Sequence, residues 1–138
     1  MRISKEERDK QKKLRDLARI FFHWRSEKFH EYEVEEDVEL TGISGKRHKF
    51  DFFLKHGDNP FLNGIGVIIK DWISHCNFQV VLRAENSMKD CQAVHKTLVI
   101  SNDFSQSARD LHEPTGVLLL SRGELISMFR QNMVDFEN

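Results

Sequence analysis

Two short apolar runs decide the fold of this chain: HKFDFFL at residues 48–54 and GVIIKDW at residues 66–72. Each run contains an ionisable residue that a buried strand does not need, Asp51 in the first and Lys70 in the second. Side chains alternate between the faces of a strand, so Ile68 and Lys70 share one face and Ile69 takes the other. If the two strands are neighbours, Asp51 and Lys70 meet near one end of a sheet, either as an ion pair or as half of a metal-dependent active site.

The residues before these runs predict a helix and a further strand. A helix is expected over residues 4–26, because SKEE at 4–7 fits a capping box and apolar residues recur at helical spacing. Apolar and polar residues alternate over 32–40, which predicts a strand, and the glycines and serine of TGISG at 41–45 predict a turn. Three strands in close succession predict an antiparallel meander. The apolar residues are Leu14, Leu17, Phe21 and Trp24 in the helix, and Tyr32, Val34, Val38 and Leu40 on one side of the strand.

After residue 76 the pattern alternates between helices and strands. We expect a helix at 77–91 with Phe78, Val81, Ala84 or Glu85, and Met88 along its inner side. Strands follow at 96–100 and 117–120, separated by a short helix that ends at Pro114, and the capping box SRGE at 121–124 opens a final helix. Strand–helix–strand connections require parallel pairing. The prediction is therefore an α/β protein, one domain over residues 1–138, with a mixed sheet covered by helices.

The composition describes an ordinary globular protein, and its formal net charge of −1 gives no reason to expect nucleic acid. The first helix nevertheless carries a basic stripe, which either lies along phosphates or is a solvated face. Cys76 and Cys91 have no partners at metal-ligand spacing, so neither a disulfide framework nor a zinc site is indicated. No run has signal-peptide or transmembrane character, which predicts a cytoplasmic protein. The stripe consists of Arg8, Lys12, Arg15 and Arg19.

The order of elements and four short motifs carry a resemblance to a known family. The motifs are YEVE at 32–35, SGKRHKFD at 44–51, VIIKDW at 67–72 and VISN at 99–102. Together they resemble the PD-(D/E)xK, or restriction-endonuclease-like, nucleases, most closely the Mrr-type and archaeal Holliday-junction-resolvase-like domains. The resemblance covers residues 12–126 and implies an αβββαβ core, followed here by a C-terminal αβα extension.

The resemblance also implies a site. It places a metal-binding acid at Asp51 and a catalytic amine at Lys70, with Mg²⁺ or Mn²⁺ as cofactor and the main-chain carbonyl of Ile69 as a further ligand. Such an ion prefers carboxylate oxygens, polarises a scissile phosphate and activates bound water, and a nearby lysine stabilises the developing charge. The DNA contacts that it implies come from the basic stripe and from Ser44 and Lys46.

The chain departs from that pattern at Ile68, where the family has an acid. A hydrocarbon cannot ligate a metal, so three alternatives stand. The carboxylate has moved to Glu85 on the following helix, or Asp16 or Glu7 on the first helix supplies it, or the site is inactive. Without the resemblance, Asp51 and Lys70 are read as a structural ion pair and Glu85 as an exposed helix residue. His48 falls on the face opposite Asp51, which favours a polar role near the turn.

Two functions follow from different classes. The first is a divalent-metal-dependent DNA endonuclease of restriction or junction-resolving type, for which a homodimer is expected because cutting both strands needs two sites. The second is a catalytically inactive nuclease-fold protein that binds DNA or serves as a structural module. The sequence leaves open whether the protein is an enzyme, because fold ancestry alone gives only an analogy about function.

Overall fold

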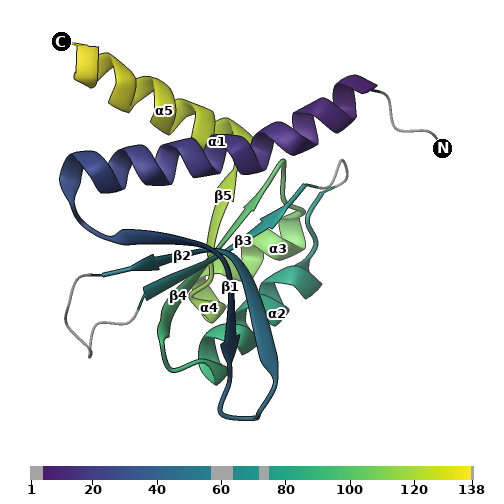
Figure 1. The fold of residues 1–138 in the computed structure, drawn as a ribbon. Coiled ribbons are helices and arrows are strands. Elements are labelled where there is room, and N and C mark those ends of the chain that lie inside the picture. The colour runs from purple at the N-terminus through teal and green to yellow at the C-terminus, as the bar shows by residue number, and fades with distance from the viewer. Residues whose placement is uncertain (1–4, 57–63, 72–74, 138) are drawn as a thin grey trace.

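The computed structural model describes residues 5–56, 64–71 and 75–137, and of residues 5–13 and 132–137 it describes only the backbone. The predicted order of elements is confirmed (Figure 1). The first half comprises α1 (Lys5–Phe29), β1 (Glu33–Thr41), β2 (Arg47–Lys55) and β3 (Gly64–Lys70). The second comprises α2 (Phe78–Asp90), β4 (Val94–Ser101), α3 (Gln106–Asp110), α4 (His112–Thr115), β5 (Leu118–Ser121) and α5 (Arg122–Glu137).

The strands form one mixed sheet in the order β1-β2-β3-β4-β5. β1, β2 and β3 pair antiparallel, and β3, β4 and β5 pair parallel, as the meander and the later strand–helix–strand pattern predicted. The capping box at α5 is also confirmed, because Ser121 Oγ accepts from Glu124 N at 3.2 Å and Glu124 Oε1 accepts from Ser121 N at 3.1 Å. The SKEE box and Trp72 lie outside the residues whose side chains are described.

One prediction about the C-terminal extension is wrong. The helix before β5 is divided in two at Leu111, and Pro114 lies inside α4 instead of ending a helix. A proline is tolerated in the first turn because the N–H that it lacks has no partner within the helix there. Gly116, with φ of 74°, ends α4 in the left-handed conformation that glycine adopts without strain.

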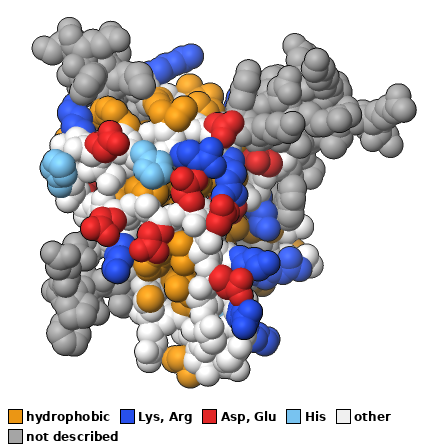
Figure 2. Space-filling view, viewed as in Figure 1, with side chains coloured by type: hydrophobic (Ala, Val, Ile, Leu, Met, Phe, Trp, Pro, Cys, Tyr) orange, Lys and Arg blue, Asp and Glu red, His pale blue; other side chains and the backbone are white. Residues whose placement is uncertain are grey.

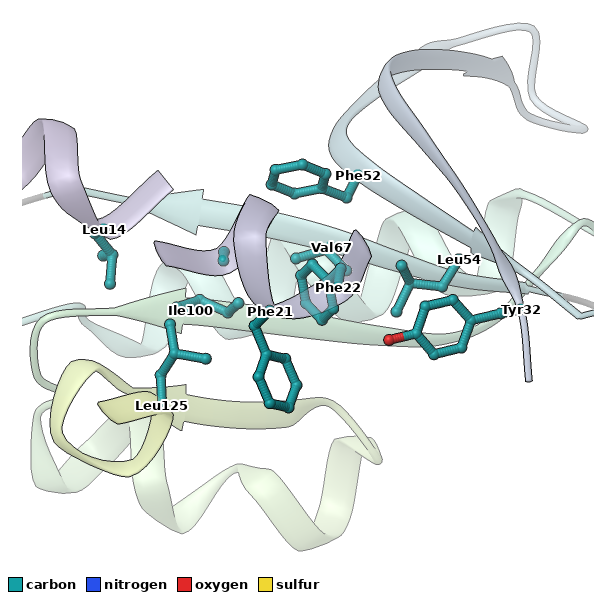
Figure 3. Packing of buried hydrophobic residues seen from close by; sticks show 10 residues of the cluster. Leu14, Phe21, Phe22, Tyr32, Phe52, Leu54, Val67, Ile100 and Leu125 are labelled. Carbon is teal, nitrogen blue, oxygen red and sulfur yellow. The ribbon is translucent and has the colours of Figure 1, made fainter. Parts of the chain in front are cut away.

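Helices α1 and α5 lie on one side of the sheet (Figure 1). From α1, the buried side chains of Leu14, Phe21 and Phe22 pack on the sheet residues Phe52 and Val67 (Figure 3). Phe22 and Phe52 meet edge to face, with ring centroids 5.5 Å apart. This confirms the predicted apolar stripe, and it fixes α1 above the middle of β2, where Asp51 lies.

The opposite side of the sheet is covered by α2, α3 and α4. Val80, Val81 and Ala84 of α2 are buried there against Val99 of β4. Phe78, predicted on the inner side, is instead 43% exposed. With 3.6 residues per turn, Phe78 lies about a third of a turn from the centre of the observed stripe through 80, 81 and 84, which puts it at the edge of that stripe.

The β1–β2 hairpin leaves the main sheet beyond Phe52. Val34 of β1 packs with the cluster on the α1 side, whereas Val38 and Leu40, predicted on the same side of the strand, pack in a separate cluster with Phe50 and Phe53. The change comes at Asp37, whose φ of 52° is unusual for a strand residue. The hairpin therefore turns away from the sheet at Asp37 of β1 and Asp51 of β2.

In the part of the chain that the structure describes, no helix has the length and apolarity needed to cross a membrane. The cytoplasmic location stays a prediction.

Candidate functional site

A cleft opens where β2 parts from β3. The two strands are in register over only three pairs, from Phe52↔Val67 to Leu54↔Ile65, whereas β2 continues alongside β1 as far as Arg47. The cleft has a volume of about 540 Å³. It is lined by Asp37, Val38 and Glu39 of β1, by Lys49, Phe50 and Asp51 of β2, and by Ile68, Ile69 and Lys70 of β3. Asp51 and Lys70 thus lie at one cleft, as the two apolar runs suggested.

The Asp51 carboxylate has a partner on each oxygen. Its Oδ1 accepts from Arg15 Nη1 at 2.5 Å, and its Oδ2 accepts from Ile69 N at 2.7 Å. The second bond takes the place of a strand-to-strand hydrogen bond, because the β2–β3 ladder has ended by this point. Asp51 therefore bridges the parted strands and at the same time ties them to α1.

The same guanidinium also binds Asp37, whose Oδ1 accepts from Arg15 Nη2 at 2.6 Å. The β1–β2 ladder steps from Glu36↔Phe52 to Val38↔Phe50, so Asp37 and Asp51 are the two residues that face each other at the skipped position. Like charges opposite each other on neighbouring strands repel, and Arg15 compensates both. Burial of the Arg15 guanidinium works against its charge, but the hydrogen bonds and charges of the two aspartates outweigh that effect and raise its pKa.

Asp71, the residue after β3, is the member of this site that the sequence reasoning missed. Its Oδ1 is buried and has no hydrogen-bond partner in the protein. Burial raises the pKa of Asp71 to about 6, helped by the charge of Asp51 and opposed by the charges of Arg15 and Arg122. The place of Asp71 directly after a strand that pairs in parallel was the available signal, because functional side chains gather at the carboxyl ends of such strands.

Lys70 reaches the cleft from the other face of the sheet. Ile68, two residues earlier, packs with the clusters on the α2 side. Burial raises the pKa of the Cys76 thiol in that region to about 11, and the nearby Lys70 ammonium opposes the shift. The main chain of Lys70 is fixed by Ser101, whose hydroxyl donates to its carbonyl at 3.0 Å.

Three of the six predicted DNA contacts, Arg15, Arg19 and Ser44, are engaged inside the protein. Arg19 Nε donates to Glu36 of β1 at 2.6 Å, and Figure 2 shows positive and negative side chains interleaved where α1 crosses the sheet. Ser44 donates to Asp90 from both its N–H and its hydroxyl. Lys46 is exposed. The side chains of Arg8 and Lys12 lie outside the described residues.

Of the residues considered for the missing carboxylate, Glu85 and Asp16 are not part of the cleft lining. Glu85 is on α2, where its Oε2 lies 3.5 Å from Lys89 Nζ. Asp16 pairs with Arg19 on the exposed surface of α1, and the side chain of Glu7 lies outside the described residues. His48, as predicted, faces away from Asp51. Its ring contacts two residues of α2, Ser87 through Nδ1 at 3.0 Å and Asp90 through Nε2 at 2.7 Å.

The divalent ion that the resemblance implies does not fit these side chains as they stand. Both oxygens of Asp51 are occupied, one of them by a cation, and residue 68 is a hydrocarbon. Among the described residues, no three His, Cys, Asp or Glu side chains lie close enough together to hold a metal ion. Hard divalent cations need open carboxylate oxygens, and Asp71 Oδ1, which has no hydrogen-bond partner, is buried and lies outside the cleft lining.

No family model and no curated protein sequence gives a significant match to the chain. Among solved structures, its fold is similar to that of AF1548, a protein of unknown function, with a TM-score of 0.62 and 12% sequence identity over 86% of this chain. A slighter likeness, with a TM-score of 0.42 and 12% identity over 75% of this chain, is to the apo form of EndoMS. The chain spans 65% and 44% of the lengths of those two proteins. The first likeness shows the fold alone, and the second is too slight to support an argument.

Proposed function

We propose that this protein is a nuclease-fold domain that binds DNA, with the guanidinium of Arg15 in the position that the resemblance gives to a divalent cation. The observation that supports this is the contact of 2.5 Å between Arg15 Nη1 and Asp51 Oδ1. A guanidinium neutralises the carboxylate as a metal would, but it carries no bound water to activate. Together with Ile68, it makes binding without hydrolysis the function that the site supports best.

The DNA contacts of this proposal come from lysines of the cleft and the hairpin. Lys49 and Lys70 line the cleft, and Lys46 and Arg47 are exposed farther along the same hairpin. Lysine and arginine side chains that neutralise phosphates supply sequence-independent affinity, which falls as salt rises. This charge is local, so the net charge of −1 does not oppose it.

Fluorescence anisotropy with a labelled duplex and a four-way junction, in EDTA at two salt concentrations, tests the proposal. We expect salt-sensitive binding by the wild type. Lys49→Gln should reduce the slope of log affinity against log salt by about one, because one phosphate contact is lost. Lys55→Gln, on the same strand but outside the cleft lining, is the matched control and should bind as the wild type does. A wild type without salt-sensitive binding would refute the proposal.

A second candidate is the divalent-metal-dependent endonuclease, of restriction or junction-resolving type. Two observations favour it: Asp51 and Lys70 share one cleft, and Asp71 presents an unpartnered carboxylate oxygen beside Asp51. In this candidate Mg²⁺ or Mn²⁺ replaces Arg15 at Asp51, and a homodimer is proposed because cutting both strands needs two sites.

Incubation with supercoiled plasmid and a four-way junction in Mn²⁺ separates the two candidates. Nicking by the wild type that disappears in both Asp51→Asn and Lys70→Ala would establish the endonuclease. The inactive domain predicts no nicking by the wild type. A gain of nicking in Ile68→Glu would then identify the missing acid as the defect.

A further inference from the structure

The turn of the β1–β2 hairpin is fixed by one carboxylate, Asp90, at the end of α2. Asp90 Oδ1 accepts from Ser44 N at 3.0 Å, and Oδ2 accepts from Ser44 Oγ and lies against His48 Nε2, both at 2.7 Å. The Asp90 carbonyl also accepts from Ile43 N at 2.9 Å. Gly42 permits this approach, because a Cβ there would fall 1.9 Å from Asp90 Oδ2. The turn is therefore held in one position.

This anchored turn presents an apolar side chain to solvent. Ile43 is 73% exposed, more than any other large hydrophobic residue in the described part of the chain. The turn is anchored by backbone groups and by the side chains of Ser44 and His48, so the side chain of Ile43 is not needed to anchor it. By contrast, the next most exposed, Ile20 at 53%, lies on the outer surface of α1.

Basic residues follow this isoleucine in the hairpin and end the helix that anchors it. Lys46 is exposed, and the side chains of Arg47 and Lys89 are 77% and 71% exposed, with Glu39 at 3.4 Å from Arg47 and Glu85 at 3.5 Å from Lys89. The negative charge of Asp90 is directed inward to Ser44 and His48. In Figure 2, the lower end of the molecule, where the hairpin turn lies in Figure 1, has hydrophobic surface with Lys and Arg side chains beside it.

We propose that Ile43 is an apolar wedge that the hairpin inserts between base pairs of duplex DNA, with Lys46 and Arg47 on the flanking phosphates. This rests on the proposed function of DNA binding and adds a contact to it. Apolar side chains inserted at a base step unstack the bases and bend the duplex, and neighbouring basic residues hold its backbone. A wedge held in place before binding loses little conformational freedom when it inserts.

The wedge and the cleft can act on one duplex. Asp51 lies four positions after Arg47 in β2, which is about 13 Å at the usual rise of a strand. One helical turn of DNA measures about 34 Å. A duplex that runs along the hairpin can therefore place phosphates at Lys49 in the cleft while the turn contacts a base step less than one helical turn away.

A duplex that carries 2-aminopurine tests the wedge, because this base fluoresces more strongly when it is unstacked. In EDTA, we expect the wild type to raise the fluorescence and Ile43→Ser to abolish that rise, with about tenfold weaker binding by anisotropy, equivalent to about 1.4 kcal/mol. The salt slope should stay unchanged in Ile43→Ser, because no charge is removed, and should fall by about one in Lys46→Gln. Circular dichroism should show both variants folded.

Ile20→Ser, which removes a similar exposed side chain from α1, is the matched control and should behave as the wild type does. If the wild type binds the duplex and Ile43→Ser matches it in both affinity and 2-aminopurine signal, the wedge is refuted and DNA binding stands. If the wild type does not bind DNA at all, both the wedge and the proposed function are refuted.

Discussion

The part of the β1–β2 hairpin that projects from the sheet, residues 37–51, is attached to a helix at each of its two ends. One end lies at the cleft and the other is the turn, and the two attachments differ in kind. At the cleft end, Asp37 and Asp51 of the hairpin share one cation, Arg15 of α1. At the turn end, the carboxylate belongs to the helix, and Asp90 receives its hydrogen bonds from the hairpin. At the turn end, the Asp90 carboxylate has all its hydrogen bonds from the hairpin. At the cleft end, the two carboxylates depend on the Arg15 cation, which another cation could replace. Asp90 therefore positions the turn, whereas Asp37 and Asp51 are the carboxylates at which one cation could be exchanged for another.

Two aspartates sharpen this contrast. The hydrogen bond from the Ser44 hydroxyl, with those from His48 and the Ser44 N–H, lowers the pKa of Asp90 to about 2. Burial raises the pKa of Asp71, beside the cleft, to about 6. A carboxylate held below its ordinary pKa stabilises the folded state at neutral pH, and one held above it destabilises that state. Carboxylates whose pKa is raised by burial are found at functional sites more often than in structural networks.

The largest effect should come from breaking the cleft end. Arg15→Ala leaves Asp37 and Asp51 opposite each other without a cation, and we expect it to lower the free energy of unfolding by about 1–2 kcal/mol. Urea denaturation at neutral pH measures this. Arg47→Ala, which removes a surface pair with Glu39 at 3.4 Å, is the control and should cost less than about 0.5 kcal/mol. Equal losses in the two variants would show that the cleft end is an ordinary surface ion pair.

A smaller effect of opposite sign is expected at Asp71. The folded protein binds a proton at Asp71 more readily than the unfolded chain does, so this carboxylate costs stability as pH rises from 3.8 through about 6. Asp71→Asn should therefore be more stable than the wild type at pH 8, by about 1 kcal/mol once solvent screening is allowed for, and should match it below pH 4. Thermal melts across this pH range measure the difference. A variant that is less stable at pH 8 would mean that the charges of Arg15 and Arg122 outweigh the burial of Asp71.

The smallest effect on global stability should appear at the turn end, in Asp90→Asn. The wild type gains stability from Asp90 above the ordinary pKa of 3.8 and loses it as pH falls towards about 2. The variant should thus be less stable than the wild type at pH 7 and equal to it near pH 2. Hydrogen exchange at the Ser44 amide should become faster in the variant, since that amide donates to the Asp90 carboxylate. Unchanged exchange would refute Asp90 as the anchor of the turn.

The sequence carried enough information for the elements and the sheet. Helical spacing of Leu14, Phe21 and their neighbours, and the strand–helix–strand order after β3, decide the topology through local periodicity and connection rules. These signals are short-range. The prediction that Phe78 faces inward failed because the first residue of a helix lies at the edge of its stripe, where a shift of one position moves it to the surface.

The site was predictable only in part, because its decisive contacts join distant segments. Asp51 and Lys70 were found as ionisable residues in apolar runs. Their partners were not, since no spacing rule relates Arg15 to Asp51 across 36 residues, and the helical spacing of Arg15 predicts only a phosphate contact or a solvated face. The left-handed conformation of Asp37 and the unpartnered oxygen of Asp71 are products of packing, which no local pattern records.

The central claim is that Arg15 takes the place of a divalent cation at Asp51, and Mn²⁺ binding tests it most directly. Isothermal titration calorimetry should detect no site in the wild type, a weak one in Arg15→Ala, and none in the double variant Arg15→Ala/Asp51→Asn. Binding by the wild type that is lost in Asp51→Asn would contradict the claim, because the cleft would then hold a metal beside its arginine. Absence of binding in Arg15→Ala would contradict it as well, because removal of the guanidinium would not have freed a cation site.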